Sequence, residues 1–301
     1  MEIAFQSRVE VAHFYEDIFE KQVYLRNGIT LDEGACVFDV GANIGLFTLY
    51  VHQRVANATI FCFEPAPPLF EILSSNVSRR GVDAKLFNCG VSDRSRTERF
   101  TFYPNSSGMS SFYADLNEEK EALRIIMLNQ LRRGEPGMGQ VMKYADELLE
   151  ERFKSETFEC PLVTLSEVIE RHGVGRIDLL KIDVQKSEMD VIEGIKDEDW
   201  RAIRQVALEA HDLDGRLDKI TRLLNKRDFE IIAEQDEMYQ GSVIYNLYAF
   251  NRNFNDDLSG RPEARKAMER STLERIQDRA RRHELALGRR KDVSSGRRKG
   301  E

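Results

Sequence analysis

The sequence of 301 residues has no C-x-x-C pair and no long hydrophobic run. Its four cysteines, Cys36, Cys62, Cys89 and Cys160, are widely spaced, and the first three lie in apolar, strand-like segments where Cys behaves as a small hydrophobe. This pattern argues against a disulfide framework and indicates buried thiols in a reducing compartment. No segment approaches the roughly 18 apolar residues of a membrane span, and the N-terminus lacks the apolar core of a signal peptide. We therefore expect a soluble, cytoplasmic protein.

Positive charge is scarce over most of the chain. The net charge is −8, although residues 261–301 carry 14 Lys and Arg against 7 Asp and Glu. A nucleic-acid-binding protein usually presents a basic face, so neither nucleic acid nor membrane is an expected partner. Residues 255–301 are predicted to form a basic helical or disordered tail or an inter-domain linker. A partner-docking helix and a nucleic-acid contact are the alternatives for this tail.

The remaining sequence alternates between strand-like and helix-like segments. This rhythm predicts an α/β fold with a parallel sheet covered by helices. Residues 1–30 are expected to form an N-terminal helical cap, and residues 31–254 the core, interrupted by an insertion at about 94–160. Strands are predicted at 35–40, 58–64, 84–91, 177–184, 204–210, 229–234 and 243–250. The last two are expected to be an antiparallel pair.

Residues 37–45, VFDVGANIG, form a glycine turn after a buried strand. A dinucleotide fingerprint needs a middle glycine for close approach to a pyrophosphate, and Asn43 stands at that position. A P-loop is excluded because no G-K-[ST] follows. Asp39 before the turn and Glu64 after the next strand favour a cationic ligand and repel phosphate. These features indicate a nucleoside without phosphates, such as S-adenosylmethionine, while a turn that binds nothing is the alternative.

Six blocks of sequence occur in an order typical of one enzyme family. They are VFDVGANIGLFTLY, FCFEPAPPLFEILSSNV, NCGVSD, TLSEVI, IDLLKIDVQKSEMDVIEGI and VALEAHD. Together they resemble FkbM-type S-adenosylmethionine-dependent methyltransferases over residues 10–252. KIDVQKSE departs from the commoner KIDVEG-E form and is similar to versions in O-methyltransferase domains of polyketide synthases and nonribosomal peptide synthetases. The resemblance implies a class I methyltransferase fold, a Rossmann-like, seven-stranded, mostly parallel sheet with helices on both faces and a lid insertion.

The resemblance also implies a set of cofactor-binding residues, because ligands of such sheets bind at the carboxyl ends of the strands. The residues expected to hold the methionine end are Asp39, Gly41, Asn43 and Gly45. Glu64 would bind the ribose hydroxyls, with Pro65 shaping the turn. The residues expected along the adenine are Asn88, Gly90 and Ser92, and the residue expected to border the methyl group and the acceptor is Asp183.

Methyl transfer to a hydroxyl also requires the loss of a proton, so a base helps. His211 lies just past a strand, and histidine titrates closest to neutral pH. Glu209 stands two residues earlier, on the same face of an extended strand. We predict His211 as the base, Glu209 as its partner and Asp183 beside the reacting groups. A histidine without a catalytic role is the alternative.

The insertion at 94–160 is predicted to be a lid over the acceptor, with a loop at 106–113 that closes on cofactor or substrate. The predicted pocket residues are Tyr15, Tyr24, Ser110, Ser111 and Lys181. A plain surface loop, core aromatics and, for Lys181, a structural ion pair are the alternatives. No metal is predicted, although Asp183, Glu209 and His211 together are a possible divalent-ion set.

The leading functional hypothesis is an S-adenosylmethionine-dependent O-methyltransferase of natural-product biosynthesis, with S-adenosylhomocysteine as product. Its acceptor would be a β-hydroxyl or enol of a polyketide or peptide intermediate. An acyl or peptidyl carrier protein and neighbouring megasynthase domains are the expected partners. Methylation of a free small molecule or sugar, C- or N-methylation, and a non-catalytic nucleoside-binding module are the alternatives.

Overall fold

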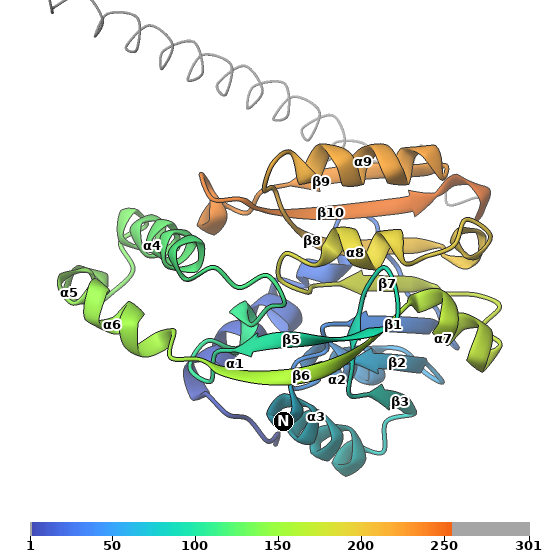
Figure 1. Ribbon diagram of the computed structural model, residues 1–301, viewed down its shortest axis with the longest axis horizontal. Helices are drawn as coiled ribbons and strands as arrows, with labels where there is room; N and C mark the ends of the chain where they lie inside the picture. Colours follow the sequence, from blue (N-terminus) through green and yellow to red (C-terminus); the bar gives the residue numbers. More distant parts are fainter. Residues whose placement is uncertain (1, 255–301) are drawn as a thin grey trace, which may run out of the picture. The chain divides into compact units, whose positions relative to one another are not determined.

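The computed structural model describes residues 2–254, and within this part seven strands form one sheet in the order β3-β2-β1-β7-β8-β10-β9 (Figure 1). The strands are β1 (Cys36–Val40), β2 (Thr59–Phe63), β3 (Ala84–Phe87), β7 (Leu179–Ile182), β8 (Gln205–His211), β9 (Phe229–Glu234) and β10 (Ile244–Asn251). β10 runs antiparallel to both β8 and β9, and the other pairs are parallel. The predicted class I methyltransferase sheet is therefore confirmed.

Helices follow the strands as the alternating pattern predicts. They are α1 (Arg8–Tyr15), α2 (Leu46–Arg54), α3 (Pro67–Arg80), α7 (Leu165–His172), α8 (Glu188–Glu193) and α9 (Arg216–Lys226). Shorter helical turns are η1 (Glu16–Glu20), η2 (Val23–Leu25), η4 (Asp199–Ala202), η5 (Glu237–Tyr239) and η6 (Arg252–Phe254). Local sequence fixes several ends: Thr164 and Glu167 form a capping box at the start of α7, and Gly173 ends it in a left-handed conformation.

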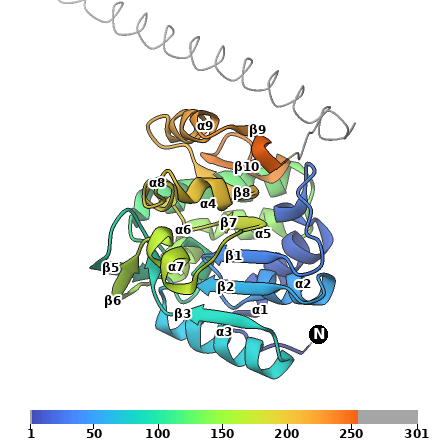
Figure 2. The same cartoon turned by 90° about the vertical axis from the view of Figure 1, so that its right-hand side faces the viewer.

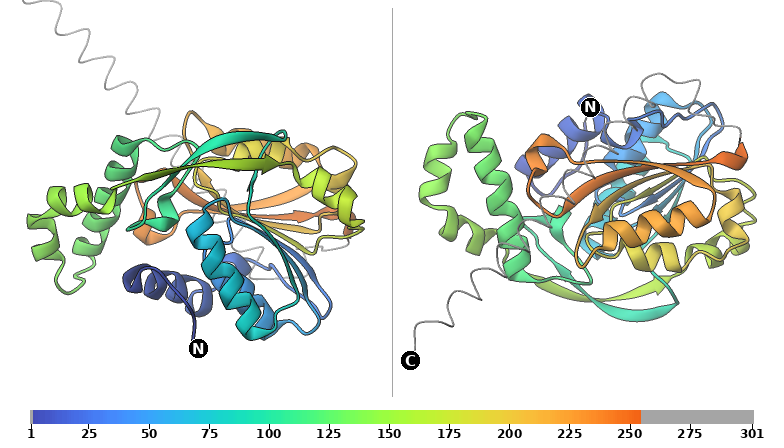
Figure 3. Two further views of the ribbon diagram at one scale, coloured as in Figure 1. Left: turned by 60° about the horizontal axis from the view of Figure 1, so that its bottom comes forward. Right: turned by 90° about the horizontal axis from the view of Figure 1, so that it is seen from above.

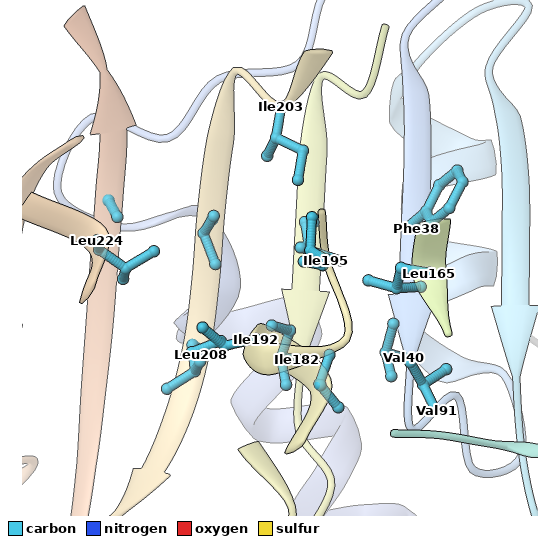
Figure 4. Packing of buried hydrophobic residues seen from close by; sticks show 14 of the residues in the cluster. Phe38, Val40, Val91, Leu165, Ile182, Ile192, Ile195, Ile203, Leu208 and Leu224 are labelled. Carbon is cyan, nitrogen blue, oxygen red and sulfur yellow. The ribbon is translucent and has the colours of Figure 1, made fainter. Parts of the chain in front are cut away.

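The central strands are buried on both faces, which explains their nearly continuous apolar sequence. One face packs against α7, α8 and α9, and Figure 4 shows Leu165, Ile192 and Leu224 of these helices against strand residues such as Phe38 and Leu208. α2 lies on the opposite side of the sheet (Figure 2). Because both faces are covered, the ends of the strands are where a polar ligand can reach the core.

The insertion after β3 contains a second sheet and three helices. β4 (Gly90–Val91), β5 (Arg96–Phe102) and β6 (Glu156–Val163) pair in the order β4-β6-β5. Between β5 and β6 come η3 (Ser107–Met109), α4 (Leu116–Arg132), α5 (Met138–Lys143) and α6 (Ala145–Arg152). Figure 3 shows these green helices together beside the main sheet, joined to it through β5 and β6. We call α4, α5 and α6 with the η3 loop the lid.

Two sequence-based boundaries need comment. The predicted third strand, 84–91, is wrong in extent: β3 ends at Phe87, and β4 belongs to the second sheet. Between them the Asn88 side chain donates to the carbonyl oxygen of Glu64 at 2.9 Å, which turns the chain out of the first sheet. The predicted tail, 255–301, lies outside the described residues.

Two expectations about composition can also be compared with the structure. All four cysteines are free, as expected, with Cys36 half-buried and the others buried. Within residues 2–254 no helix is both long and apolar enough to cross a membrane.

The glycine turn after β1 is shaped by a close approach of two backbones. Gly41 has φ +81°, and a Cβ atom added to it would lie 1.8 Å from the carbonyl oxygen of Asp183, which follows β7. Only glycine fits this position without moving one of the two strand ends. Gly34 has a similar φ of +74°, but a Cβ atom added there would have no neighbouring atom within 4 Å.

Replacing Gly41 by alanine is expected to lower the free energy of unfolding by about 2 kcal/mol or more, because left-handed strain and a backbone clash add together. Gly34→Ala is the matched control, since it introduces only the left-handed strain of about 1 kcal/mol. Urea denaturation of both variants measures the difference. Equal destabilisation of the two variants would contradict the close approach of β1 and β7.

Candidate active site

A cavity of about 880 Å³ lies at the carboxyl ends of β1, β2, β7 and β8. Its sheet-side wall includes Gly41, Glu64, Asp183 and Glu209, which follow or end these strands. Its opposite wall comes from α1 and the lid. The volume falls in the usual range for ligand pockets of roughly 300–1,000 Å³. The same cavity is therefore lined by the polar strand ends and by largely apolar residues of the lid.

Glu64 is held at the end of β2 by two backbone N–H groups. Its carboxylate accepts from Asn43 N at 2.8 Å and from Ala66 N at 2.9 Å. Burial raises the pKa of Glu64 to about 7, although the two hydrogen bonds act in the opposite direction. Glu64 lines the cavity as predicted, with Pro65 beside it. A carboxylate at this place accepts hydrogen bonds from ribose hydroxyls in the related nucleotide folds.

Asp39 has a different position from the one predicted. Its side chain is fully buried and does not line the cavity. One carboxylate oxygen lies 3.0 Å from Lys181 Nζ, and the other accepts from Thr48 Oγ1 at 2.7 Å. Lys181 also donates to the carbonyl oxygen of Gly41 at 2.5 Å. The structure thus corrects the predicted contact of Asp39 with the cofactor: Asp39 supports the turn through Lys181, which does line the cavity.

A cluster of polar side chains connects the ends of β7 and β8. Gln185 Nε2 donates to Asp183 at 3.2 Å and to Glu209 at 3.1 Å, so one amide links both carboxylates. Tyr24 Oη donates to the second oxygen of Asp183 at 2.6 Å. Burial, followed by the Asp183 charge, raises the pKa of Glu209 to about 8. All four side chains line the cavity.

His211 is not placed as its predicted role requires. It is buried, does not line the cavity, and its Nδ1 lies 3.0 Å from Oε1 of Glu188. Burial lowers the pKa of His211, but the charge and hydrogen bond of Glu188, together with the charges of Glu209 and Asp183, outweigh burial, and the net shift is upward. Glu188, the first residue of α8, therefore makes the hydrogen bond that orients the imidazole, and Glu209 does not. The charge of Glu209 still raises the pKa of His211, so Glu209 is an electrostatic partner rather than a hydrogen-bonding one.

The other predicted residues divide into two groups. Those that line the cavity as predicted are Gly41, Asn43, Pro65, Gly90, Ser110, Tyr24 and Lys181. Those that do not line it are Gly45, Asn88, Ser92, Ser111 and Tyr15. Each of the second group has another structural role. For example, Gly45 packs against Leu73, and the exposed Tyr15 stacks on Phe19 with ring centroids 4.5 Å apart.

Several cavity residues were not predicted from the sequence. Gln185 lies within the KIDVQKSE block, where no pattern indicates its left-handed φ of 47°, which is unusual for its type. Glu10 and Arg152 come from α1 and α6, far apart in the sequence. For Arg152 the sequence signal is a charge that follows Ala145, Leu148 and Leu149 on one helix face, and Glu10 has no comparable signal because its helix neighbours Ser7 and His13 are polar. Among the described residues, no group of three or more His, Cys, Asp or Glu side chains is arranged to hold a metal ion.

The residues at the strand ends fit S-adenosylmethionine better than a phosphorylated nucleotide. Glu64 disfavours an anion at the turn, and the basic side chain there, Lys181, is already paired with Asp39. Gly41, which has no side chain, lines the cavity at the end of β1. This strand order, with acids at the ends of β2, β7 and β8, defines a class I methyltransferase.

Sequence comparison identifies the family. Residues 39–231 match the model of the Methyltransferase FkbM domain, and the chain belongs to this family. It is 41% identical over 241 residues to 31-O-demethyl-FK506 methyltransferase FkbM of Streptomyces tacrolimicus, covering 80% of this chain and 90% of that protein. The chain is thus a methyltransferase, and S-adenosylmethionine is the methyl donor that its class and family imply.

Two further similarities involve longer chains. The protein is 39% identical over 259 residues to AMB antimetabolite synthetase AmbE of Pseudomonas aeruginosa, covering 84% of this chain but only 12% of AmbE. It is also similar to the crystal structure of a Methyltransferase FkbM from Methylobacillus flagellatus, with 15% identity and a TM-score of 0.44. That similarity covers 76% of this chain and 47% of the solved chain.

Replacing Lys181 by methionine is expected to lower the free energy of unfolding by about 3–5 kcal/mol, because Asp39 then stays buried without its counter-charge. The double variant Lys181→Met/Asp39→Asn is expected to recover part of this loss. Urea denaturation of the two variants and the parent measures both effects. An equal or larger loss in the double variant would argue against the ion pair as the main interaction.

Proposed function

We propose that this methyltransferase transfers a methyl group to a hydroxyl oxygen of a polyketide or peptide intermediate that is tethered to a carrier protein. The observation that carries the proposal is a single cavity with two unlike ends. The carboxylates of Glu64, Asp183 and Glu209 line one end, and apolar lid side chains line the other. S-adenosylmethionine, when bound, supplies an activated methyl group on a sulfonium centre.

The names of two relatives support the oxygen acceptor and the biosynthetic setting. The relative from Streptomyces tacrolimicus is named as a methyltransferase of 31-O-demethyl-FK506, which indicates an oxygen acceptor. AmbE is named as a synthetase, and the region similar to this chain makes up only 12% of its length. A methyltransferase region inside a long synthetase suits a substrate that is delivered by a neighbouring carrier domain.

The strand ends supply the groups that position the reaction. Glu64 would accept hydrogen bonds from the ribose hydroxyls, with its carboxylate held by the N–H groups of Asn43 and Ala66. The turn at Gly41 and Asn43 would hold the methionine end, as predicted from the sequence. Methyl transfer is an in-line displacement, so the protein acts mainly by fixing the acceptor oxygen against the methyl group.

Glu209 is the best-placed base for the acceptor proton. Asp183 accepts hydrogen bonds from both Tyr24 and Gln185. Glu209 receives only the Gln185 bond and has the raised pKa. A buried carboxyl whose pKa is raised towards the working pH is suited to general-base catalysis. Glu209 would accept the hydroxyl proton, and Asp183 would border the reacting groups.

The lid forms an apolar chamber for the rest of the acceptor. The lid residues that line the cavity include Met109, Leu123, Ile126, Met127, Met138, Val141, Leu148 and Leu149. Several are methionines, whose unbranched and flexible side chains adapt to irregular ligands. Such a surface suits an extended, largely apolar acyl chain better than a sugar, which would need more hydrogen-bonding groups.

Glu209→Gln is expected to lower kcat by about 100- to 1,000-fold, because a general base contributes on the order of 10²–10⁴-fold to a rate. For the parent enzyme, kcat should rise with pH up to about 8, since a base with a raised pKa becomes an acceptor only once deprotonated. The glutamine variant should lose this rise. Steady-state rates across about pH 6–9 measure both effects.

Three further variants control this prediction. Glu159→Gln removes an exposed carboxylate on β6 and should leave the pH profile unchanged. Asp183→Asn removes a charge that raises the pKa of Glu209, so the rise in kcat should move to lower pH. If His211→Asn removes the pH-dependent rise and Glu209→Gln does not, the base is His211, as the sequence pattern alone predicts.

The carrier-bound substrate is tested by presenting one β-hydroxyacyl group in two forms. The acyl group attached to a phosphopantetheinyl carrier protein is expected to be methylated with a kcat/KM at least about tenfold above that of the free acid. Transfer from labelled S-adenosylmethionine is followed by mass spectrometry of the intact carrier. Preferential methylation of the free acid would favour the alternative of a free small-molecule acceptor.

A further inference from the structure

Arg152 differs from the other basic side chains of the cavity. Within the described residues four basic side chains line it, and three have an acidic partner: His13 and Lys21 pair with Asp17, and Lys181 pairs with Asp39. Arg152, the last residue of α6, forms no ion pair among residues 2–254. Only its Nε has a described hydrogen bond, to Ser106 Oγ at 3.1 Å.

Glu10 is the matching acid on the other side of the same part of the cavity. It is 8% exposed, although it comes from a surface helix, α1. Its Oε1 accepts weakly from Gly108 N at 3.4 Å. Burial raises the pKa of Glu10 and lowers that of Arg152, while each charge counteracts the shift of the other. The two groups are therefore close enough to interact electrostatically but, among residues 2–254, do not form an ion pair with each other.

The η3 loop places these two charges beside the glycine turn. Ser106 contacts Arg152, and the next residue, Ser107, accepts a hydrogen bond from Asn43 Nδ2 at 3.2 Å. Asn43 in turn donates its backbone N–H to Glu64. A continuous line of contacts thus runs from Glu64, the proposed partner of the ribose hydroxyls, through Asn43 and the η3 loop to Arg152 and Glu10.

A buried carboxylate and a half-buried guanidinium that line the same cavity suit a zwitterion. A buried charge without a partner is costly, so an unpaired arginine that faces a cavity indicates an anionic ligand group. A carboxylate accepts two parallel hydrogen bonds from a guanidinium, and the terminal amino groups of Arg152 have no described partner. The Glu10 carboxylate suits an ammonium group on the same ligand.

We propose that Arg152 and Glu10 bind the α-carboxylate and the α-ammonium of the amino-acid end of the methyl donor. This inference rests on the proposed use of S-adenosylmethionine and assigns a cofactor contact to the lid. The alternative is that Arg152 binds an anionic group of the acceptor instead of the carboxylate of the methyl donor. The contact through Ser107 to Asn43 favours the cofactor, because it places the two charges next to the turn rather than in the apolar chamber.

The test compares two nucleosides that differ in the amino-acid end. S-adenosylhomocysteine carries this end, and 5′-methylthioadenosine lacks it. Isothermal titration calorimetry should show that Arg152→Gln weakens S-adenosylhomocysteine binding by about 10- to 100-fold, the usual effect of losing a charge-assisted hydrogen bond. Its affinity for 5′-methylthioadenosine should stay within about twofold of the parent's, because the removed contact is absent from that ligand.

Three variants give the matched comparisons. Arg124→Gln removes a lid arginine that pairs with Asp146 outside this cavity, and it should change neither affinity. Glu10→Gln should weaken the binding of S-adenosylhomocysteine, as Arg152→Gln does, and should leave the binding of 5′-methylthioadenosine unchanged. Arg152→Lys keeps the charge and should recover part of the affinity even if the glutamine variant is unstable.

The outcomes separate this inference from the proposed function. If Arg152→Gln weakens the binding of both nucleosides equally, the inference is overturned, and the contact of Arg152 with Ser106 has a structural role instead. An unchanged affinity for S-adenosylhomocysteine with a raised acceptor KM would assign the arginine to the acceptor and would also overturn it. A parent protein that binds neither nucleoside would contradict the proposed cofactor itself, and with it this inference.

Discussion

The contact between the ends of β1 and β7 is the constraint on which the site depends. Gly41 can approach the carbonyl oxygen of Asp183 only because it has no side chain. Lys181 stabilises the same junction because it binds both the Asp39 carboxylate and the Gly41 carbonyl oxygen. A buried charge pair with further hydrogen bonds is rigid, because moving either partner leaves a charge without compensation. The turn is therefore fixed before any ligand arrives.

From this fixed junction, acids of the same chemical type acquire different roles. Asp39 is neutralised by Lys181, and Glu64 is held by backbone N–H groups. Asp183 accepts from Tyr24 and Gln185, whereas Glu209 receives one hydrogen bond and has the raised pKa. The four carboxyls thus differ in their partners rather than in residue type, and the roles that we propose for them follow from these partners.

The sequence was sufficient for the sheet, because strand length, apolar content and turn residues are local properties. It also placed Glu64 correctly, since an acid that directly follows a strand must lie at the carboxyl end of the sheet. It did not show that Asp39 points away from the cavity or that Glu188 reaches His211 first. Both facts depend on the direction in which a side chain points near the end of a strand or at the start of a helix. Glu188 begins the short helix α8, whose packing cannot be read from hydrophobic periodicity.

The lid and the loop that carries Gln185 are joined by ion pairs and a hydrogen bond. Lys186 Nζ binds Glu118 at 2.8 Å and Glu119 at 3.0 Å in the first turn of α4. Ser111 also donates to the carbonyl oxygen of Gln185. The amide that links Asp183 and Glu209 is therefore positioned by contacts with the lid. If the lid holds the acceptor and Glu209 takes its proton, as we propose, a lid shape that admits another acceptor would also shift this amide and would couple acceptor choice to proton transfer.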